Sequence, residues 1–283
     1  MFEVHENLEN RLLSLPSTMR GLHNLGNSCY FNTAIQCLAH VPPLTKYFFD
    51  ADLSNCTCDI TKEYQKVVKK LFVKGEKSPV SPSDLLGAFR VRFPRFCFGQ
   101  QHDAQEVVLV LIDVFEESLG KEFITDLFNG EEVQETKYWG GSSTINTPFT
   151  TVLLDVSEPC RLQDLMDDKQ KSILIQNYQD EKGELHPKAE VTHHISRWPK
   201  FISFTFSMYE HKFPIEIPFE FEGRKLFACI LHQGVQHGGH YALLVRRFDK
   251  WFIKDDDKVS ELPDIQTLRG EFYQAWYRPV KSL

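Results

Sequence analysis

The sequence predicts an α+β protein, with helices in its first part and a largely antiparallel sheet in its second. Apolar residues recur at helical spacing between Cys29 and Phe115, and the alternation typical of strands becomes clear beyond Arg197. Helices and strands do not alternate along the chain, as they would in a fold built on a parallel sheet. The order of the elements therefore favours separate helical and sheet regions.

The helical region is expected to hold helices over residues 29–40, 63–73, 83–93 and 104–115. In the first of them, Phe31, Ile35 and Leu38 lie at positions i, i+4 and i+7 and so share one buried face. Pro42-Pro43 is expected to end this helix, because proline cannot continue the hydrogen-bond ladder. A short helical arm is expected over residues 1–20.

The sheet region is expected to follow a β-rich excursion that is not an independent domain, over residues 129–198. Residues 226–231 are apolar throughout, which is typical of a strand buried on both faces. Residues 240–247 and 251–253 are expected to pair as a hairpin through Asp249-Lys250. The other predicted strands cover residues 149–156, 172–175, 201–208, 215–221 and 275–278.

Bulk composition narrows the class of protein. The chain has 283 residues, of which 42% are hydrophobic, as in ordinary globular proteins. Its net charge of −7 argues against a nucleic-acid binder; it fits a basic partner, or it merely aids solubility. Seven scattered cysteines favour a reducing compartment, and neither a signal peptide nor a membrane span is apparent. We therefore expect a cytoplasmic or nuclear protein.

Residues 21–32 form the most informative stretch of the chain. They run from a loop with two glycines into an apolar helical segment, and Cys29 lies at the junction. The first N–H groups of a helix are unpaired and carry partial positive charge, so they favour an ionised sulfur. The stretch predicts a nucleophilic thiol, which needs a base, a group that orients the base, and an oxyanion site.

Residues elsewhere can meet those three needs. Among eleven histidines, His240 follows Gly238-Gly239, which let the backbone approach closely, and precedes a predicted strand that would hold its ring. Asp255 would leave the second strand of the hairpin roughly level with His240 and could fix its tautomer, although three consecutive aspartates also suit a solvated turn. Asn24 lies at a loop corner that can fold over Cys29 and donate to an oxyanion.

Two further groups of residues have competing interpretations. Asp103 and Glu106 stand together at the start of a predicted helix, where carboxylates cap the helix or form a polar rim facing a substrate. Cys56 and Cys58 are too few ligands for a zinc site, so we interpret them as loop thiols.

Three segments resemble the signature boxes of the ubiquitin-specific protease family. Residues 21–32 resemble its cysteine box, usually Gly-Leu-x-Asn-x-Gly-x-x-Cys-Tyr-x-Asn. Residues 101–106, Gln-His-Asp-Ala-Gln-Glu, are similar to its glutamine/aspartate box, and residues 232–256 to its histidine box. The boxes occur in the family order and span most of the chain. One box could arise by chance, whereas all three in order are highly specific.

The resemblance implies a papain-like cysteine protease fold with a helical thumb, β-rich fingers and an antiparallel β palm, in one catalytic domain. By position, residues 1–20 would be an N-terminal arm, 21–128 the thumb, 129–198 the fingers and 199–283 the palm. It also implies a thiol-dependent, cofactor-free deubiquitinase that hydrolyses the isopeptide bond after the C-terminal glycine of ubiquitin. The expected partners are ubiquitin and ubiquitinated proteins, with neither nucleic acid nor membrane, and we expect a monomer.

The same resemblance assigns roles residue by residue. Cys29 matches the nucleophile, His240 the general base and acid, and Asp255 the orienting carboxylate. Asp256 matches a neighbouring acidic position that supports Asp255, and Asn24 matches the oxyanion donor. The positions that would line the channel for the basic, diglycine-ended tail of ubiquitin are Gln101, Asp103, Glu106, Gly239 and Tyr241.

The chain departs from the family pattern in two places. Fingers of this family often bind zinc through two Cys-x-x-Cys pairs, but residues 129–198 contain only Cys160, so we expect short fingers without zinc. The usual Leu-x-Arg-Phe before the palm strands is Thr205-Phe206-Ser207-Met208 here. Since the fingers hold the body of ubiquitin, two alternatives stay open: a protease for a ubiquitin-like modifier, and a catalytically weak ubiquitin-binding scaffold.

Overall fold

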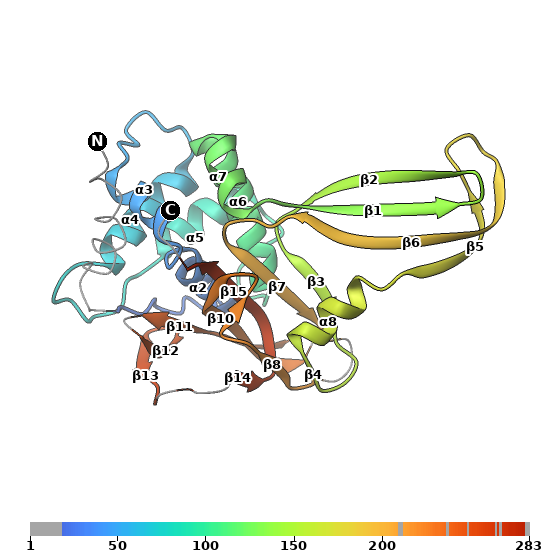
Figure 1. Ribbon diagram of the computed structural model, residues 1–283. Coiled ribbons are helices and arrows are strands. Elements are labelled where there is room, and N and C mark those ends of the chain that lie inside the picture. Colours follow the sequence, from blue (N-terminus) through green and yellow to red (C-terminus); the bar gives the residue numbers. More distant parts are fainter. Residues whose placement is uncertain are drawn as a thin grey trace, which may run out of the picture.

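The computed structural model describes residues 19–208, 212–235, 238–247, 249–263, 265 and 268–280. Of the helical arm expected over residues 1–20, all but Met19 and Arg20 lies outside this part. Figure 1 shows a group of helices packed beside a large sheet, and a long β arm that projects from both. The α+β prediction is confirmed. None of the described helices combines the length and apolarity needed to span a membrane.

The helical part, here called the thumb, comprises α2 to α7. Its helices are α2 (Cys29–Leu38), α3 (Pro42–Asp50), α4 (Asp59–Leu71), α5 (Ser83–Arg92), α6 (Ala104–Leu119) and α7 (Lys121–Phe128). The four predicted helices are confirmed as α2, α4, α5 and α6, with shifted ends. Pro42-Pro43 was expected only to end a helix, but it begins α3. Proline is tolerated there because N–H groups in the first turn have no partner within the helix, so its missing N–H costs nothing.

The palm is built on an eight-stranded sheet. Its strand order is β13-β12-β11-β10-β15-β7-β3, with β9 paired to β10. These strands are β3 (Val152–Asp155), β7 (Ile202–Ser207), β9 (Glu220–Phe221), β10 (Arg224–Val235), β11 (Gly238–Arg247), β12 (Lys250–Asp255), β13 (Lys258–Glu261) and β15 (Phe272–Pro279). A smaller sheet beside it holds β4 (Cys160–Arg161), β8 (Ile215–Ile217) and β14 (Leu268–Gly270), next to helix α8 (Leu162–Lys169).

The palm sheet separates two apolar cores. One face of the sheet packs against the helices of the thumb, and the other face covers a second core. Ala228 and Ile230 on β10 pack into the core shared with the helices, whereas Cys229 between them packs into the core on the far face. All three are fully buried, as predicted for a strand covered on both sides. All ten residues of α2 are also buried, so this helix is fixed between the other thumb helices and strands β10 to β12.

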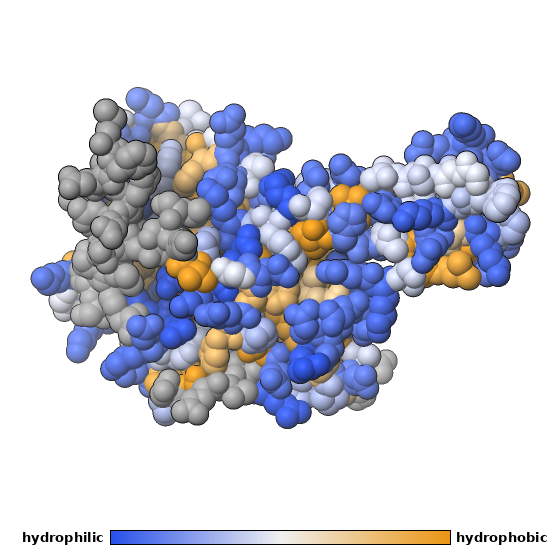
Figure 2. All heavy atoms as spheres, in the orientation of Figure 1, coloured by the Kyte–Doolittle hydropathy of each residue, from blue (hydrophilic) through white to orange (hydrophobic). Residues whose placement is uncertain are grey.

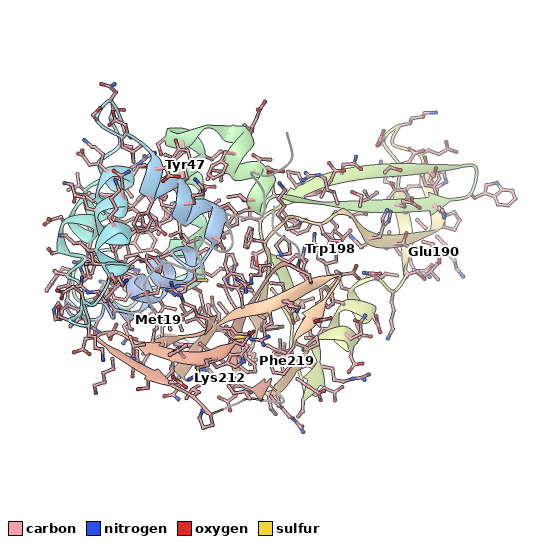
Figure 3. The ribbon with its side chains drawn as sticks, turned by 60° about the vertical axis from the view of Figure 1, so that its left-hand side comes forward. Met19, Tyr47, Glu190, Trp198, Lys212 and Phe219 are labelled. Carbon is pink, nitrogen blue, oxygen red and sulfur yellow. The ribbon has the colours of Figure 1, made fainter. Side chains whose placement is uncertain are left out.

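The projecting arm is a four-stranded antiparallel sheet in the order β2-β1-β6-β5, here called the finger arm. It comprises β1 (Gly130–Tyr138), β2 (Gly141–Phe149), β5 (Ile173–Gln179) and β6 (Leu185–Arg197). Figure 2 shows a mostly polar surface on this arm, with an apolar area on its lower side. Trp198 lies where the arm meets the palm (Figure 3), and its ring packs against those of Phe149, Phe204 and Phe221.

Candidate active site

Cys29 is the first residue of α2, and its side chain is buried. The preceding Ser28 does not cap the helix: its hydroxyl instead accepts a hydrogen bond from the Leu25 N–H at 2.8 Å. The N–H groups at the start of α2 are therefore not taken up by a side-chain cap. The backbone N–H groups of Tyr241, Tyr30 and Cys29 face the sulfur, so that β11 and α2 together surround the thiol.

The pKa of the Cys29 thiol is raised above its ordinary value of 9.0, mainly by burial. The N–H groups that face the sulfur lower this pKa, but they do not outweigh the loss of hydration. The Asp256 carboxylate raises the pKa further. At neutral pH the isolated thiol is therefore protonated, and a nearby base is required for it to react as a thiolate.

His240 and Asp255 meet across strands β11 and β12. The Nε2–H of His240 donates to Oδ1 of Asp255 at 2.5 Å, since a carboxylate can only accept. Both side chains are a little under half exposed. Their pairing leaves Nδ1 of His240 as the nitrogen that can exchange a proton with another group. Asp255 is the last residue of β12, so the sheet fixes its position.

The thiol and the imidazole belong to neighbouring segments and are not hydrogen-bonded to each other. Tyr241, whose N–H faces the Cys29 sulfur, is the residue after His240. Among the hydrogen bonds of the residues that the structure describes, none joins the Cys29 thiol to the His240 ring. Sites of this kind often tighten only when substrate is bound, so this geometry is compatible with catalysis.

Asn24 and Asp256 form a second pair beside the thiol. Nδ2 of Asn24 donates to Oδ2 of Asp256 at 2.7 Å, while Oδ1 of Asn24 accepts from the Gly26 N–H at 2.9 Å. These bonds fix the orientation of the amide. They use one of the two hydrogens on Nδ2, so the other can donate to an oxyanion. Asp256 therefore orients Asn24, as well as adjoining Asp255.

Asp256 also fastens the cysteine stretch to the palm. Its Oδ1 accepts from Nδ2 of Asn32 on α2 at 2.8 Å, and its backbone carbonyl accepts from the Leu22 N–H at 2.8 Å. At Gly21 any side chain would overlap the carbonyl oxygen of Asp256 and lie 2.6 Å from that of Asp257. Sequence reasoning assigned no role to Asn32 or Gly21, although both belong to the cysteine-box pattern.

Two clefts lie between thumb and palm beside these residues. One has a volume of about 590 Å³ and is lined by the loop 99–103, Asn27, His232, Gly238 and Tyr241. The other, of about 400 Å³, extends along the palm past Asp155, Met208 and Glu271. Asp103, His232 and Tyr241 line both. The two clefts therefore adjoin each other and are together called the channel here; Tyr241, in the wall that they share, also presents its N–H to the Cys29 sulfur.

Comparison with known protein families identifies the chain. Residues 20–275 match the family model described as ubiquitin carboxyl-terminal hydrolase. The chain belongs to the ubiquitin carboxyl-terminal hydrolase family. Ubiquitin carboxyl-terminal hydrolase 17-like protein D of Mus musculus is 26% identical over 300 residues, which cover 91% of this chain and 54% of that protein. Ubiquitin carboxyl-terminal hydrolase cyk-3 of Caenorhabditis elegans is 37% identical over 109 residues, 35% of this chain and 9% of that protein.

The fold of this chain is shared with solved structures. The structure of the SAGA Ubp8/Sgf11/Sus1/Sgf73 DUB module bound to ubiquitin aldehyde matches with a TM-score of 0.79 at 18% identity, over 94% of this chain and 70% of that chain. A variant of the same module bound to monoubiquitin matches with a TM-score of 0.81 at 19% identity, over the same shares of the two chains. The chain spans about half the length of the mouse relatives that it matches.

The residues predicted to line the tail channel differ in their surroundings. Asp103 caps α6 by accepting from the Gln105 N–H at 2.7 Å and also accepts from the Tyr273 hydroxyl. Glu106 is ion-paired with Arg95 at 2.8 Å and is not among the residues that line either cleft. The capping interpretation therefore holds for Asp103 together with a place in the channel wall. Sequence reasoning did not find Tyr273, which has no local signal.

Gln101, Gly239 and Tyr241 lie where the thumb meets the palm. The Gly239 N–H donates to Oε1 of Gln101 at 2.5 Å, which joins the loop before α6 to the start of β11. A side chain at Gly239 would overlap Nε2 of His232 and lie 2.5 Å from the Gln233 carbonyl. The Tyr241 ring is buried and stacks on that of His232 at 4.3 Å. Tyr241 therefore supports the wall of the channel.

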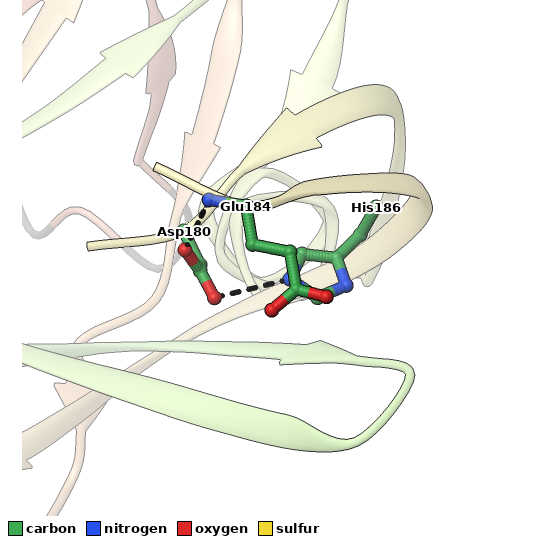
Figure 4. Close-up of side chains that lie close together, drawn as sticks. All are labelled: Asp180, Glu184 and His186. Carbon is green, nitrogen blue, oxygen red and sulfur yellow. Dashed lines mark hydrogen bonds and ion pairs between the residues drawn. The ribbon is translucent and has the colours of Figure 1, made fainter. Parts of the chain in front are cut away.

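The end of the finger arm carries a different cluster (Figure 4). His186 is buried and its Nε2 pairs with Oδ2 of Asp180 at 3.1 Å, while the Tyr138 ring packs against it at 4.3 Å. The hydrogen bond from His186 is the main reason why the pKa of Asp180 is lowered. Asp180, Glu184 and His186 could hold a metal ion, since one ligand atom of each lies within 4.8 Å of the others.

The Asp180 carboxylate already has partners on both oxygens, because Oδ1 accepts from the Lys182 and Glu184 N–H groups at 2.9 and 2.8 Å. We therefore interpret the cluster as a clamp that closes the β5–β6 turn. Cys160, the cysteine of the predicted finger region, lies on β4 in the small sheet and not on the finger arm.

Proposed function

We propose that this chain is a cysteine-type deubiquitinase, which hydrolyses the isopeptide bond after the C-terminal glycine of ubiquitin on conjugated proteins. Membership of the hydrolase family supports this proposal, and so do the two similar structures, one bound to ubiquitin aldehyde and the other to monoubiquitin. We further infer that the chain acts in the cytoplasm or nucleus as a monomer. Its seven free thiols and its negative charge support a reducing compartment and a basic partner.

The observation that carries the proposal is the convergence of three segments on one thiol. Cys29 begins α2, His240 and Asp255 come from adjacent strands with a bond of 2.5 Å, and Asn24 folds back beside them. A nucleophile, a base, an orienting carboxylate and an oxyanion donor are thus in one place. Such a set suits acyl transfer, because each group answers one need of that reaction.

In the first half of the proposed reaction, Nδ1 of His240 takes the proton of the Cys29 thiol. The sulfur attacks the carbonyl carbon of the terminal glycine, and the carbonyl oxygen becomes an oxyanion. The Cys29 N–H and the second Nδ2 hydrogen of Asn24 donate to that oxyanion. When the C–N bond breaks, His240 gives its proton to the leaving lysine amine, and a thioester remains on Cys29. Asp255 stabilises the imidazolium throughout.

In the second half, water replaces the departed amine. His240 removes a proton from the water as it attacks the thioester, and the oxyanion forms again in the same place. Collapse of this intermediate breaks the C–S bond and releases the C-terminal carboxyl group of ubiquitin, which loses its remaining proton to solvent. His240 returns its proton to the sulfur, which regenerates the starting state. The raised pKa of the thiol favours this return, since a buried thiolate is the less stable form.

The channel suits a basic tail that ends in glycines. Asp103, Asp155 and Glu271 place carboxylates along the palm cleft. Near Gly239 and Gln101 the thumb and palm approach closely enough for a direct hydrogen bond at 2.5 Å. Such a constriction favours residues without side chains at the two positions before the scissile bond. Charge along the channel and narrowness at its end together support ubiquitin as the substrate.

A ubiquitin propargylamide probe tests the proposal, because it labels only a thiol that is reactive beside bound ubiquitin. We expect a covalent adduct on Cys29 that is lost in Cys29→Ala. No adduct with folded protein would contradict the enzyme and favour a ubiquitin-binding scaffold. The same probe built on ubiquitin-like modifiers tests the substrate, and stronger labelling by one of them would assign the chain to that modifier.

A further inference from the structure

Lys254 is a lysine buried beneath the active site. It precedes Asp255 on β12, and only 4% of its surface is exposed. Its Nζ donates to Oε1 of Gln36 at 2.7 Å and to the backbone carbonyl of Arg20 at 3.2 Å. Nε2 of Gln36 donates to the same Arg20 carbonyl at 3.0 Å. Three groups from three segments therefore form one closed hydrogen-bonded set.

The three segments are those that carry the reacting groups. Gln36 lies on α2 two helical turns after Cys29, and so on the same side of the helix. Arg20 begins the loop that leads to Asn24. Lys254 itself adjoins Asp255, the partner of His240. A shift of any one segment against the others would change the separation of the thiol, the oxyanion donor and the base.

A positively charged neighbour of Lys254 is Arg247 on β11, whose guanidinium opposes the Lys254 ammonium. His40, two residues after α2, is neutral, because burial and then the charges of Lys254 and Arg247 hold its pKa well below 6.5. Arg20 contributes only its carbonyl here, because its guanidinium turns away to the Lys70 carbonyl at 2.8 Å. Among the ion pairs of the described residues, none includes Lys254. Burial, and to a smaller extent Arg247, lowers the pKa of Lys254 from 10.5 to about 7.

We propose that Lys254 is a positioning residue for the proposed hydrolase reaction, and that it holds α2, the Asn24 loop and β12 together best in its uncharged form. A neutral amine has two N–H donors, which match the Gln36 and Arg20 oxygens. An ammonium adds a third donor and a charge that faces Arg247. Protonation therefore loosens the joint between the segments without breaking the fold.

The sign of the pH effect follows from linkage. Unfolded lysine has its ordinary pKa of about 10.4, so above neutrality the unfolded chain binds more protons than the folded chain does. Lys254 therefore makes the unfolding temperature rise as the pH increases from 7 towards 9. Below pH 7 both states carry the proton, and this contribution no longer changes.

The experiment compares wild type with Lys254→Met, which keeps the side-chain length and removes both donors and the charge. Lys250→Met is the matched control, since Lys250 lies on the same strand but is exposed. Thermal unfolding is recorded from pH 6.5 to 9, and a fluorogenic ubiquitin amide gives kcat and KM. We expect the unfolding temperature to rise with pH more steeply in wild type and in the control than in Lys254→Met, because the buried thiols contribute equally to all three. We also expect its kcat to fall about 10- to 100-fold with KM nearly unchanged.

A second variant covers the case in which Lys254→Met does not fold. Gln36→Glu places a carboxylate opposite Nζ without changing shape, so Lys254 stays charged in the folded protein. We expect this variant to fold and its unfolding temperature to rise less steeply than that of wild type between pH 7 and 9. An unchanged slope in Gln36→Glu, or curves for wild type and Lys254→Met that run parallel, would overturn the proposal.

The inference rests on the proposed function only where kcat and KM for the ubiquitin amide are used. Alkylation of Cys29 by iodoacetamide, followed by peptide mass spectrometry, reports the state of the thiol without ubiquitin. We expect the pH profile of alkylation to shift in Lys254→Met and not in Lys250→Met. If wild type cleaves no ubiquitin substrate, the proposed function fails, and the unfolding and alkylation curves still decide the role of Lys254. Coincident alkylation profiles would count against it.

Discussion

Two regions of the molecule are stabilised by different kinds of interaction. One is the place where Asn24, Cys29, His240, Asp255 and Asp256 meet, here called the junction, and the other is the finger arm. At the junction, particular side chains make the bonds: Asn24 and Asn32 donate to Asp256, and His240 to Asp255, over distances of 2.5 to 2.8 Å. In the finger arm, the strands pair through backbone groups that every residue but proline possesses. One region therefore requires residue identity, whereas the other requires mainly extended backbone.

This difference predicts which substitutions should reduce activity and which should not. A change at the junction leaves a buried polar group without its partner or moves a reacting atom, and both effects are large. A change in the finger arm alters the shape of a surface that only the body of a modifier would touch. Catalytic power should thus be concentrated at the junction, while the arm should influence how tightly a substrate is held.

The largest expected effect is that of His240→Ala. Without the base the thiol keeps its proton at neutral pH, because burial raises its pKa. We expect kcat for a fluorogenic ubiquitin amide to fall about 10⁴-fold or more. The fall in kcat for Asp255→Ala should be about 10- to 100-fold smaller than that for His240→Ala, since an orienting group is easier to replace than a base. Equal losses in two folded variants would contradict the roles given to this pair.

Next in size is the oxyanion donor. Asn24→Ala removes the Nδ2 group and should lower kcat about 10²- to 10³-fold, with little change in KM. Asp256→Ala should also lower kcat, because Asn24 then loses the 2.7 Å bond that orients it. Asp256 orients this amide and also accepts from Asn32, so the loss in the double variant should be smaller than the two single losses combined. Additive losses would show that Asp256 acts by another route.

How far the sequence predicts each region follows from the same contrast. Cys29, Asn24 and Gly21 stand close together and in a pattern, since sterics and hydrogen bonding allow few substitutes there. The pairing of His240 with Asp255 was also accessible, because a hairpin brings them together. Tyr273 and Lys254 had no local signal, since their partners lie on other segments and only the folded chain joins them.

The finger arm was predicted only in outline. Residues 141–149 form strand β2, yet most of them are exposed and polar, so the usual apolar alternation is missing. The turn-rich composition of this segment hid a strand that owes its place to pairing with β1. The Asp180–His186 clamp could not be foreseen, because either residue alone is commonplace on a surface.

A glycine at the edge of the junction gives a smaller effect of steric origin. Gly239→Ala would bring its Cβ onto the His232 ring and to 2.5 Å from the Gln233 carbonyl. The start of β11 must then shift, and His240 shifts with it, so we expect kcat to fall about tenfold. The neighbouring Gly238→Ala is the matched control, since its Cβ would meet only Gln101 Oε1 at 3.6 Å. Similar kinetics of the two variants would argue against this steric requirement.

The smallest expected effect lies at the end of the finger arm. His186→Ala removes the ring that fills the space beside Tyr138 and leaves the Asp180 carboxylate without its 3.1 Å partner. The β5–β6 turn should open more often, which hydrogen exchange would detect as faster exchange confined to residues 178–188. The clamp lies at the end of the finger arm, away from Cys29. We therefore expect KM for the ubiquitin amide to rise only about two- to tenfold. The rate of Cys29 alkylation by iodoacetamide should not change.

Trp139→Ala, on the same arm but 90% exposed, is the control for a change that leaves the clamp intact. A fall in kcat for His186→Ala comparable to that for Asn24→Ala would break the distinction between the two regions, because it would mean that the arm also sets the geometry of the thiol.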